Sequence, residues 1–149
     1  MITTISILKE KYKDYANPLD KIKRDTDKGL LFRVTKGIYE TDSHTDPCLL
    51  ASCIQPLSYL SFDWALSYYG LIPERVVSVT SATFKNRKNK TFENYFGRYE
   101  YTDIPPKAYP DGVTYLERGE YMVKIATKEK AICDSLCKWR VVKSIKDLK

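Results

Sequence analysis

The 149-residue chain lacks a long hydrophobic run, since its longest apolar stretch is far shorter than the roughly 18 residues that cross a bilayer. Its first residues, MITTISILKEKYKDYA, become charged at Lys9 and lack the basic start and small-residue cleavage site of a signal peptide. Both absences argue against a membrane or secreted protein. We therefore expect a cytoplasmic location and no membrane partner.

Residues that form catalytic sites are also scarce. The one histidine, His44, lies between Asp42 and Asp46 in a polar segment, where we expect a solvated side chain in preference to a metal ligand. There is no glycine-rich phosphate loop and no His-plus-carboxylate cluster of the hydrolase type. The acidic-x-Lys spacing of metal-dependent nucleases is found at residues 147–149, the end of the chain. We expect that the protein is not an enzyme and that it has no catalytic residue and no cofactor.

The four cysteines occur as two pairs, Cys48 with Cys53 and Cys133 with Cys137. Four residues separate the first two cysteines and three separate the second two, whereas two residues separate the cysteines of a zinc knuckle. Free cysteine usually packs as a small hydrophobic residue. We therefore expect reduced, half-buried thiols and no metal site.

The composition, with 43% hydrophobic and 30% charged residues, supports a folded core in one ordinary domain or in a small module joined to a larger one. The net charge is +6, which permits nucleic-acid binding without requiring it. Basic residues gather in three places. Residues 1–40 hold nine Lys or Arg, and further clusters are KNRKNK at 85–90 and the tail KWRVVKSIKDLK.

Two consecutive helices are predicted near the N-terminus. Apolar residues at helical spacing indicate an amphipathic helix over 4–15. In the second helix Asn17 is the expected N-cap, Pro18 suits the first helical position, Asp20 favours the positive helix end, and Gly29 provides a left-handed stop.

The two faces of this second helix differ in chemistry. Leu19, Ile22 and Thr26 are expected to face inward. The cations fall on another face at steps of three and four: Lys21, Arg24 and Lys28, with Lys23 on the flank. Such a helix suits recognition of a DNA major groove, where cations reach phosphates and base edges. The alternative is an ordinary solvated surface helix.

Residues 30–40, LLFRVTKGIYE, predict a hairpin with Phe32 and Val34 inward, Arg33 outward and a turn at 35–37. A helix, a capped basic helix and a basic-tipped hairpin follow one another in a winged helix-turn-helix. We therefore predict a DNA-binding module at residues 1–41, with Arg33 and Lys36 reaching the DNA backbone or minor groove.

The polar segment 41–47 marks the boundary to a second module, residues 47–149. It is predicted to contain an apolar helical segment at 48–54, a helix capped by Ser61 and ended by Gly70, and a strand at 76–84. Further strands, a hairpin turning at 118–119 and a helix at 127–139 complete it. We expect an α+β fold, with a mostly antiparallel sheet flanked by helices.

The basic turn of this module is a second candidate for nucleic-acid contact, through Lys85, Arg87, Lys88 and Lys90. With Tyr95, Tyr99 and Tyr101 nearby it would suit a single strand, whose bases stack on aromatic rings. A solvated turn is the simpler interpretation.

The helix at 61–70, together with the residues just before it, allows two interpretations. Its aromatic residues either build the core or form a surface for a partner; they are Tyr59, Trp64, Tyr68 and Tyr69.

Several motifs resemble AbiEi-type antitoxins of bacterial type IV toxin–antitoxin systems, and the likeness covers nearly the whole chain. The central stretch is YLSFDWALSYYGLIPERVVSVTSAT (59–83). It is flanked by NPLDKIKRDTDKGLLFRVTKGIYE (17–40) and IATKEKAICD (125–134). The matching residues are Asn17-Pro18, Lys21-Ile22, Gly29, Gly37-Ile38-Tyr39, Tyr59-Leu60-Ser61, Ala65-Leu66, Tyr69-Gly70-Leu71-Ile72-Pro73, Thr80-Ser81-Ala82-Thr83 and Glu129-Lys130-Ala131.

The resemblance implies a winged-helix module that binds double-stranded operator DNA and represses its own operon. It also implies a second domain that counteracts a nucleotidyltransferase-like toxin, without necessarily forming a stable complex with it. The chain ends soon after the helix at 127–139, where such antitoxins continue, so a shortened second domain is expected. An RNA- or protein-binding module, a nuclease-like enzyme and a homodimer remain open alternatives at this point.

Overall fold

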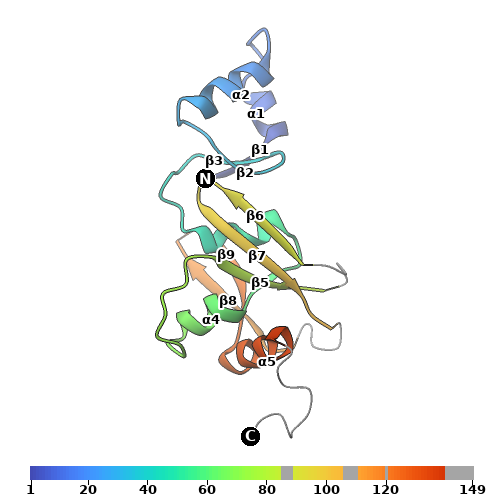
Figure 1. Cartoon of the computed structure of the whole chain (residues 1–149). Helices are drawn as coiled ribbons and strands as arrows, with labels where there is room; N and C mark the ends of the chain where they lie inside the picture. Colours follow the sequence, from blue (N-terminus) through green and yellow to red (C-terminus); the bar gives the residue numbers. More distant parts are fainter. Residues whose placement is uncertain (85–88, 106–110, 120, 140–149) are drawn as a thin grey trace, which may run out of the picture. The chain divides into compact units, whose positions relative to one another are not determined.

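The computed structural model describes residues 1–84, 89–105, 111–119 and 121–139. The chain has an α+β fold (Figure 1) and divides into two compact units. Unit 1 contains Met1–Asp46 and Asn94–Phe96, and unit 2 contains Pro47–Glu93 and Gly97–Lys149. None of the described helices is long and apolar enough to span a membrane.

Unit 1 combines two helices with a small sheet. Its elements are β1 (Ile2–Thr4), α1 (Ile5–Lys11), α2 (Pro18–Asp27), β2 (Phe32–Thr35) and β3 (Ile38–Glu40). The strands are antiparallel in the order β1-β3-β2, so the N-terminal strand completes the predicted hairpin (Figure 1). A small core of Leu8, Ile22 and Leu31 joins the helices to the chain segment that enters β2.

Several local predictions in unit 1 are confirmed. The Asn17 side chain accepts a hydrogen bond from the Asp20 amide at 3.4 Å, and Pro18 begins α2. Gly29 has a φ of +76°, which favours glycine, directly after the C-cap Lys28. Val34 is buried and Arg33 is exposed, as the alternation in the hairpin requires.

Two other predictions are wrong. The first helix does not begin at residue 4, because residues 2–4 pair with β3 as a strand and the Thr4 side chain caps α1. Leu19 does not face inward, because it is half exposed on the first turn of α2, whereas Ile22 is buried. The buried stripe of α2 therefore continues from Ile22 to Asp25.

Unit 2 is built on a six-stranded sheet in the order β6-β7-β5-β4-β9-β8. Its strands are β4 (Tyr59–Leu60), β5 (Val79–Thr83), β6 (Lys90–Asn94), β7 (Gly97–Asp103), β8 (Val113–Arg118) and β9 (Tyr121–Ala126). Pairs β4–β9 and β5–β7 are parallel, and pairs β4–β5 and β8–β9 are antiparallel. The mostly antiparallel sheet that was expected therefore also contains parallel pairs, which the sequence did not predict.

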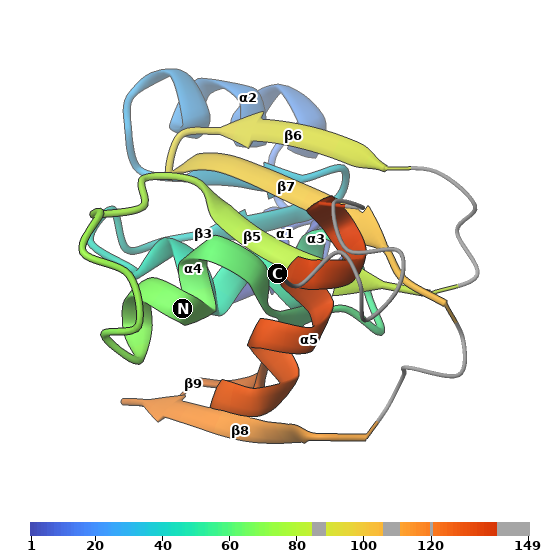
Figure 2. The ribbon, with the colours of Figure 1, turned by 60° about the horizontal axis from the view of Figure 1, so that its bottom comes forward.

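Helical segments cover both faces of this sheet: the short helix η1 (Pro47–Leu50) with α3 (Ala51–Ile54), and α4 (Phe62–Tyr68) with α5 (Lys128–Trp139). The hydroxyls of Tyr99 and Tyr101 on β7 bond to the carbonyls of Pro47 and Ala51. On the opposite face Thr80 of β5 bonds to the backbone of α4, beside α5 (Figure 2). Every residue of β5 is buried, as expected for a strand covered on both sides.

Candidate nucleic-acid interface

The predicted DNA-contacting residues of unit 1 lie on α2 and on the β2–β3 hairpin. Of the four cations of α2 and its C-cap, Lys21 has a different environment from the other three. Its ammonium bonds to Asp25 at 2.9 Å and lies 5.6 Å and 5.3 Å from the ring centres of Tyr12 and Tyr15. Lys21 therefore belongs to the packing between α1 and α2, and the expectation that it projects with Arg24 and Lys28 is wrong.

Asp25 is the centre of this packing contact and was not identified from the sequence. It is buried and accepts a second hydrogen bond from the Tyr12 hydroxyl at 2.7 Å. The bonds from Tyr12 and then from Lys21 lower the pKa of Asp25, and the bond to Asp25 raises the pKa of Tyr12 to about 12. The same bond to Asp25 raises the pKa of Lys21. The i,i+4 spacing of Lys21 and Asp25 was the one local signal of this contact.

The other cations occupy what we call the open face of α2, formed by Asp20, Lys23, Arg24, Asp27 and Lys28. All five residues are exposed. The first four line a shallow depression of about 490 Å³. Three cations and two carboxylates share this face, so it carries donors for phosphates and guanine together with acceptors for cytosine amino groups.

The hairpin contributes two further cations. Arg33 is exposed on β2, opposite Tyr39, and Lys36 is exposed in the turn. Gly37, which ends the turn, has a φ of +78°, and its carbonyl accepts the amide of Ile5 at 2.8 Å. The turn that carries Lys36 is therefore fixed to the start of α1.

The second predicted cluster lies mostly outside the described residues. Lys85, Arg87 and Lys88 lie outside the described residues, while Lys90 is exposed at the start of β6. The aromatic partners proposed for a single strand are not available, because Tyr99 and Tyr101 are buried and hydrogen-bonded to η1 and α3. Tyr95 is exposed, but its ring packs 4.4 Å from that of Phe32 within unit 1.

The net charge is distributed unevenly along the sequence. Residues 85–88, 106–110, 120 and 140–149 contain eight Lys or Arg and two Asp or Glu, which accounts for the whole excess of +6. The described residues therefore carry equal numbers of positive and negative side chains. Binding through α2 would depend on where its side chains lie, because unit 1 lacks a strong overall positive charge.

The motif residues of unit 2 meet in one buried polar cluster. Asp134 of α5 accepts hydrogen bonds from the hydroxyls of Tyr59 at 2.7 Å and Ser61 at 2.8 Å, and its other oxygen pairs with Lys130 at 3.0 Å. The Thr80 hydroxyl bonds to the Ser61 carbonyl at 2.6 Å. All five residues are buried, so this cluster connects α5 to the sheet and to α4 and is closed to a substrate.

The aromatic residues at 59–69 divide between the two alternatives left open by the sequence. Tyr59 is buried, and the Tyr69 hydroxyl bonds to the Ala126 carbonyl at 2.7 Å. Trp64 and Tyr68 stack on each other with ring centres 5.6 Å apart, and Tyr68 is partly exposed. The buried Tyr59 and the half-buried Tyr69 are held by hydrogen bonds and are structural, and the stacked pair lies at the surface of α4.

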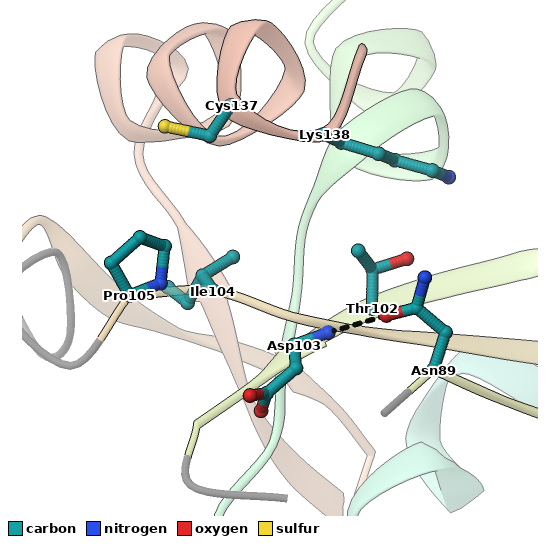
Figure 3. A pocket seen from close by; sticks show the side chains of 7 residues that line it. All are labelled: Asn89, Thr102, Asp103, Ile104, Pro105, Cys137 and Lys138. Carbon is teal, nitrogen blue, oxygen red and sulfur yellow. Dashed lines mark hydrogen bonds between the residues drawn. The ribbon is translucent and has the colours of Figure 1, made fainter. Parts of the chain in front are cut away.

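A hollow of about 470 Å³ lies beside the end of α5, lined by Asn89, Thr102, Asp103, Ile104, Pro105, Cys137 and Lys138 (Figure 3). The Asn89 side chain accepts the Asp103 amide at 3.0 Å. Figure 3 shows the Cys137 sulfur and the Lys138 ammonium pointing in opposite directions. Lys138 lies 5.0 Å from the ring centre of Phe62. This arrangement does not pair a thiol with a cation that would activate it.

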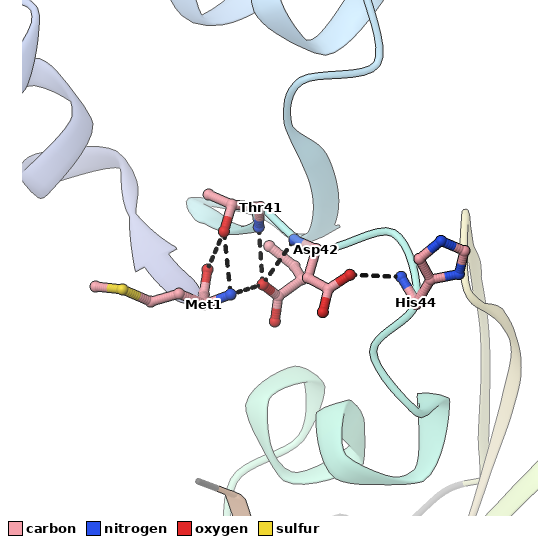
Figure 4. Close-up of polar contacts among 5 residues, drawn as sticks. Met1, Thr41, Asp42 and His44 are labelled. Atoms are coloured by element: carbon pink, nitrogen blue, oxygen red, sulfur yellow. Dashed lines mark hydrogen bonds and ion pairs between the residues drawn. The ribbon is translucent and has the colours of Figure 1, made fainter. Parts of the chain in front are cut away.

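The histidine and the cysteines form no larger cluster. His44 is exposed, and its backbone amide donates to Asp42 at 2.9 Å (Figure 4). In the same segment the buried Glu40 accepts the amides of Thr41 and Asp42 and the amino group of Met1. Cys48 is buried, Cys53 is half-buried, and Cys133 and Cys137 are exposed. Within the described part of the chain no three His, Cys, Asp or Glu side chains are placed to hold a metal.

Comparison with known proteins assigns no family, since no protein-family model and no curated protein sequence matches the chain.

Proposed function

We propose that this protein is a DNA-binding antitoxin of the AbiEi type, which represses its own operon and counteracts a nucleotidyltransferase-like toxin in the cytoplasm. The observation that carries the proposal is the two-sided environment of α2. One side is held on α1 by Ile22 and by the contacts of Asp25 with Lys21 and Tyr12. The other side presents the cations of the open face to solvent.

The order of elements in unit 1 supports a winged helix-turn-helix. Helices α1 and α2 are followed directly by the β2–β3 hairpin, which β1 extends to three strands. In such a module the second helix enters the major groove and the hairpin is the wing. Arg33 and Lys36 would then contact phosphates, and the contacts of Gly37 with α1 would hold the wing in place.

The mixed charge of the open face favours reading of base edges. Arg24 can form two hydrogen bonds with guanine, and the carboxylates of Asp20 and Asp27 can accept from the amino group of cytosine. Lys23 and Lys28 would contact backbone phosphates at the two sides of the open face. In a face with this composition, phosphate contacts supply affinity for any duplex and base contacts supply the preference for one sequence.

For unit 2, the support is the convergence of the resembling motifs. YLS at 59–61, Thr80 and the segment 129–134 lie far apart in the chain and meet around Asp134. Because the resembling motifs share one structural role, they support a domain of the same kind as in AbiEi-type antitoxins. The proposed antitoxin activity of unit 2 rests on the resemblance.

The DNA-binding part is tested with a duplex that contains the promoter upstream of this reading frame. We expect binding by fluorescence anisotropy, and loss of at least about 100-fold in affinity when Lys23, Arg24 and Lys28 are all replaced by alanine. The matched control replaces Lys9 and Lys11 of α1 and Lys13 just after it, which removes the same charge from the same unit. Equal losses in both triple variants would contradict recognition by α2.

The antitoxin part is tested separately by co-expression with a nucleotidyltransferase-like gene from the adjacent reading frame. We expect the wild-type chain to restore growth in cells that express this toxin. The α2 triple variant should also restore growth from a heterologous promoter, because the proposal places neutralisation in unit 2. Failure of both proteins to restore growth would remove the antitoxin assignment and leave DNA binding standing.

A further inference from the structure

Three strongly exposed apolar side chains of unit 2 lie around one hollow. Leu57, Tyr115 and Met122 are 65%, 61% and 56% exposed. They line a depression of about 180 Å³ together with Ser52, Ser58, Val123 and Lys124. Leu57 also has a φ of +68°, a backbone conformation that L-residues other than glycine rarely adopt. Apolar groups gathered in this way are typical of an interaction surface.

The patch lies beside an edge of the sheet. β8 is the last strand in the order and pairs with β9, and no other strand among the described residues pairs with it. The strand, VTYLER, contains neither lysine nor proline, which commonly protect an edge, and its two charged residues, Glu117 and Arg118, have opposite signs and can pair with other groups. The opposite edge, β6, begins with the exposed Lys90 and carries the exposed Glu93. Of the two edges, β8 is the one suited to pairing with another strand.

We propose that β8 pairs with β8 of a second copy of this chain, antiparallel and about a two-fold axis at Leu116. In this register Tyr115 lies opposite Glu117 of the second copy, and Thr114 lies opposite its Arg118. No like charges stand directly opposite each other, which such pairing requires. The proposal concerns unit 2 and does not depend on DNA binding by unit 1.

The neighbouring strand makes this register complementary. Within one chain Lys124 is paired with Tyr115, and Met122 is paired with Glu117. Four side chains on neighbouring strands therefore form a row across the axis. Lys124 and Tyr115 come from one copy, and Glu117 and Met122 come from the second copy. An ammonium and a carboxylate flank one ring, and the apolar residues of both patches join across the interface.

Pairing of identical edges also explains why association would stop at two. A two-fold contact uses the same strand in both copies and leaves no further β8 edge, so it is closed. Pairing of β8 with β6 would instead use different edges and continue into a filament. The charged residues of β6 oppose that outcome.

The test is sedimentation of the full chain from about 1 to about 300 µM, because a short interface gives affinities on the order of micromolar. We expect the mass to rise towards twice 17.3 kDa. Tyr115→Glu should raise the dissociation constant at least about tenfold, since it places a carboxylate directly opposite Glu117 of the second copy and the axis repeats this pair. Adding Glu117→Lys to this variant places opposite charges directly across the axis and should recover most of the loss.

The matched control is Val77→Lys, which places a charge on another exposed apolar residue of unit 2 and should leave dimerisation unchanged. Circular dichroism melts at about 1 µM would show that each variant is folded. A wild-type chain that sediments at 17.3 kDa throughout would overturn the proposal. So would a dimer in which Tyr115→Glu behaves like Val77→Lys.

Discussion

At the scale of single residues, two buried aspartates organise the two units. Asp25 joins α1 to α2 through Tyr12 and Lys21, and Asp134 joins α5 to the sheet through Tyr59, Ser61 and Lys130. A buried carboxylate is costly unless donors surround it. Each aspartate meets this requirement with hydrogen bonds from another element together with a lysine one helical turn away.

Asp25→Asn tests the first of these contacts. The folded state lowers the pKa of Asp25, so its ionised form contributes stability above the unfolded pKa of about 4, and this contribution is lost as the pH falls through the lower folded value. At pH 7 we expect the variant to be about 2 kcal/mol less stable in urea unfolding. The difference should shrink as the pH falls below about 4. A difference that stays constant down to pH about 2 would contradict the role given to the charge.

Asp134→Asn tests the second contact. The amide retains the shape of the carboxylate but removes the charge opposite Lys130, so we expect a loss of about 3 kcal/mol or more in the free energy of unfolding. Cys133→Ser, an exposed change at the preceding residue, should alter stability by no more than about 0.5 kcal/mol. Equal stability of the two variants would show that the buried pair is not a main support of unit 2.

At the scale of elements, α2 depends on its ends. The Asn17 side chain satisfies one amide of the first turn. Asn17→Ala should therefore lower the protection of α2 amides in hydrogen exchange by about 1 kcal/mol, whereas Asn17→Asp should preserve it. If alanine and aspartate give the same protection, the cap does not contribute to the stability of the helix.

These element ends are the part of unit 1 that the sequence predicts well. Asn17, Pro18 and Gly29 act through local backbone chemistry, and so does the turn at Gly37. The inward face of α2 was predicted only in part. A pattern of apolar residues favours Leu19 as a core residue and gives no reason to bury Asp25, whose partner Tyr12 comes from another helix.

In unit 2 the sequence likewise does not predict which residues far apart in the chain come into contact. Its hairpin and closing helix were predicted, but the parallel pairing of β5 with β7 and of β4 with β9 was not. Neither was the meeting of Tyr59 with Asp134, which lie 75 residues apart. Local periodicity does not report which distant strands or side chains become neighbours.

At the scale of the whole molecule, the charge distribution predicts how DNA binding responds to salt. The proposed interface has five cations: Lys23, Arg24, Lys28, Arg33 and Lys36. Because Arg24 is assigned to guanine, the other four contact phosphates, and the logarithm of the binding constant should fall with a slope of about −3.6 against the logarithm of salt concentration. Lys36→Ala should reduce the magnitude of this slope by about 0.9. An unchanged slope would place the phosphate contacts elsewhere in the chain.

The central claim is that the open face of α2 meets the DNA, and lysine acylation measured by mass spectrometry with and without the promoter duplex tests it most directly. The account predicts that the duplex protects Lys23, Lys28 and Lys36, while Lys9 and Lys11 of α1 and the following Lys13 react as in the free protein. Protection confined to the basic residues of 85–90 and 138–149, with the lysines of α2 unchanged, would contradict it.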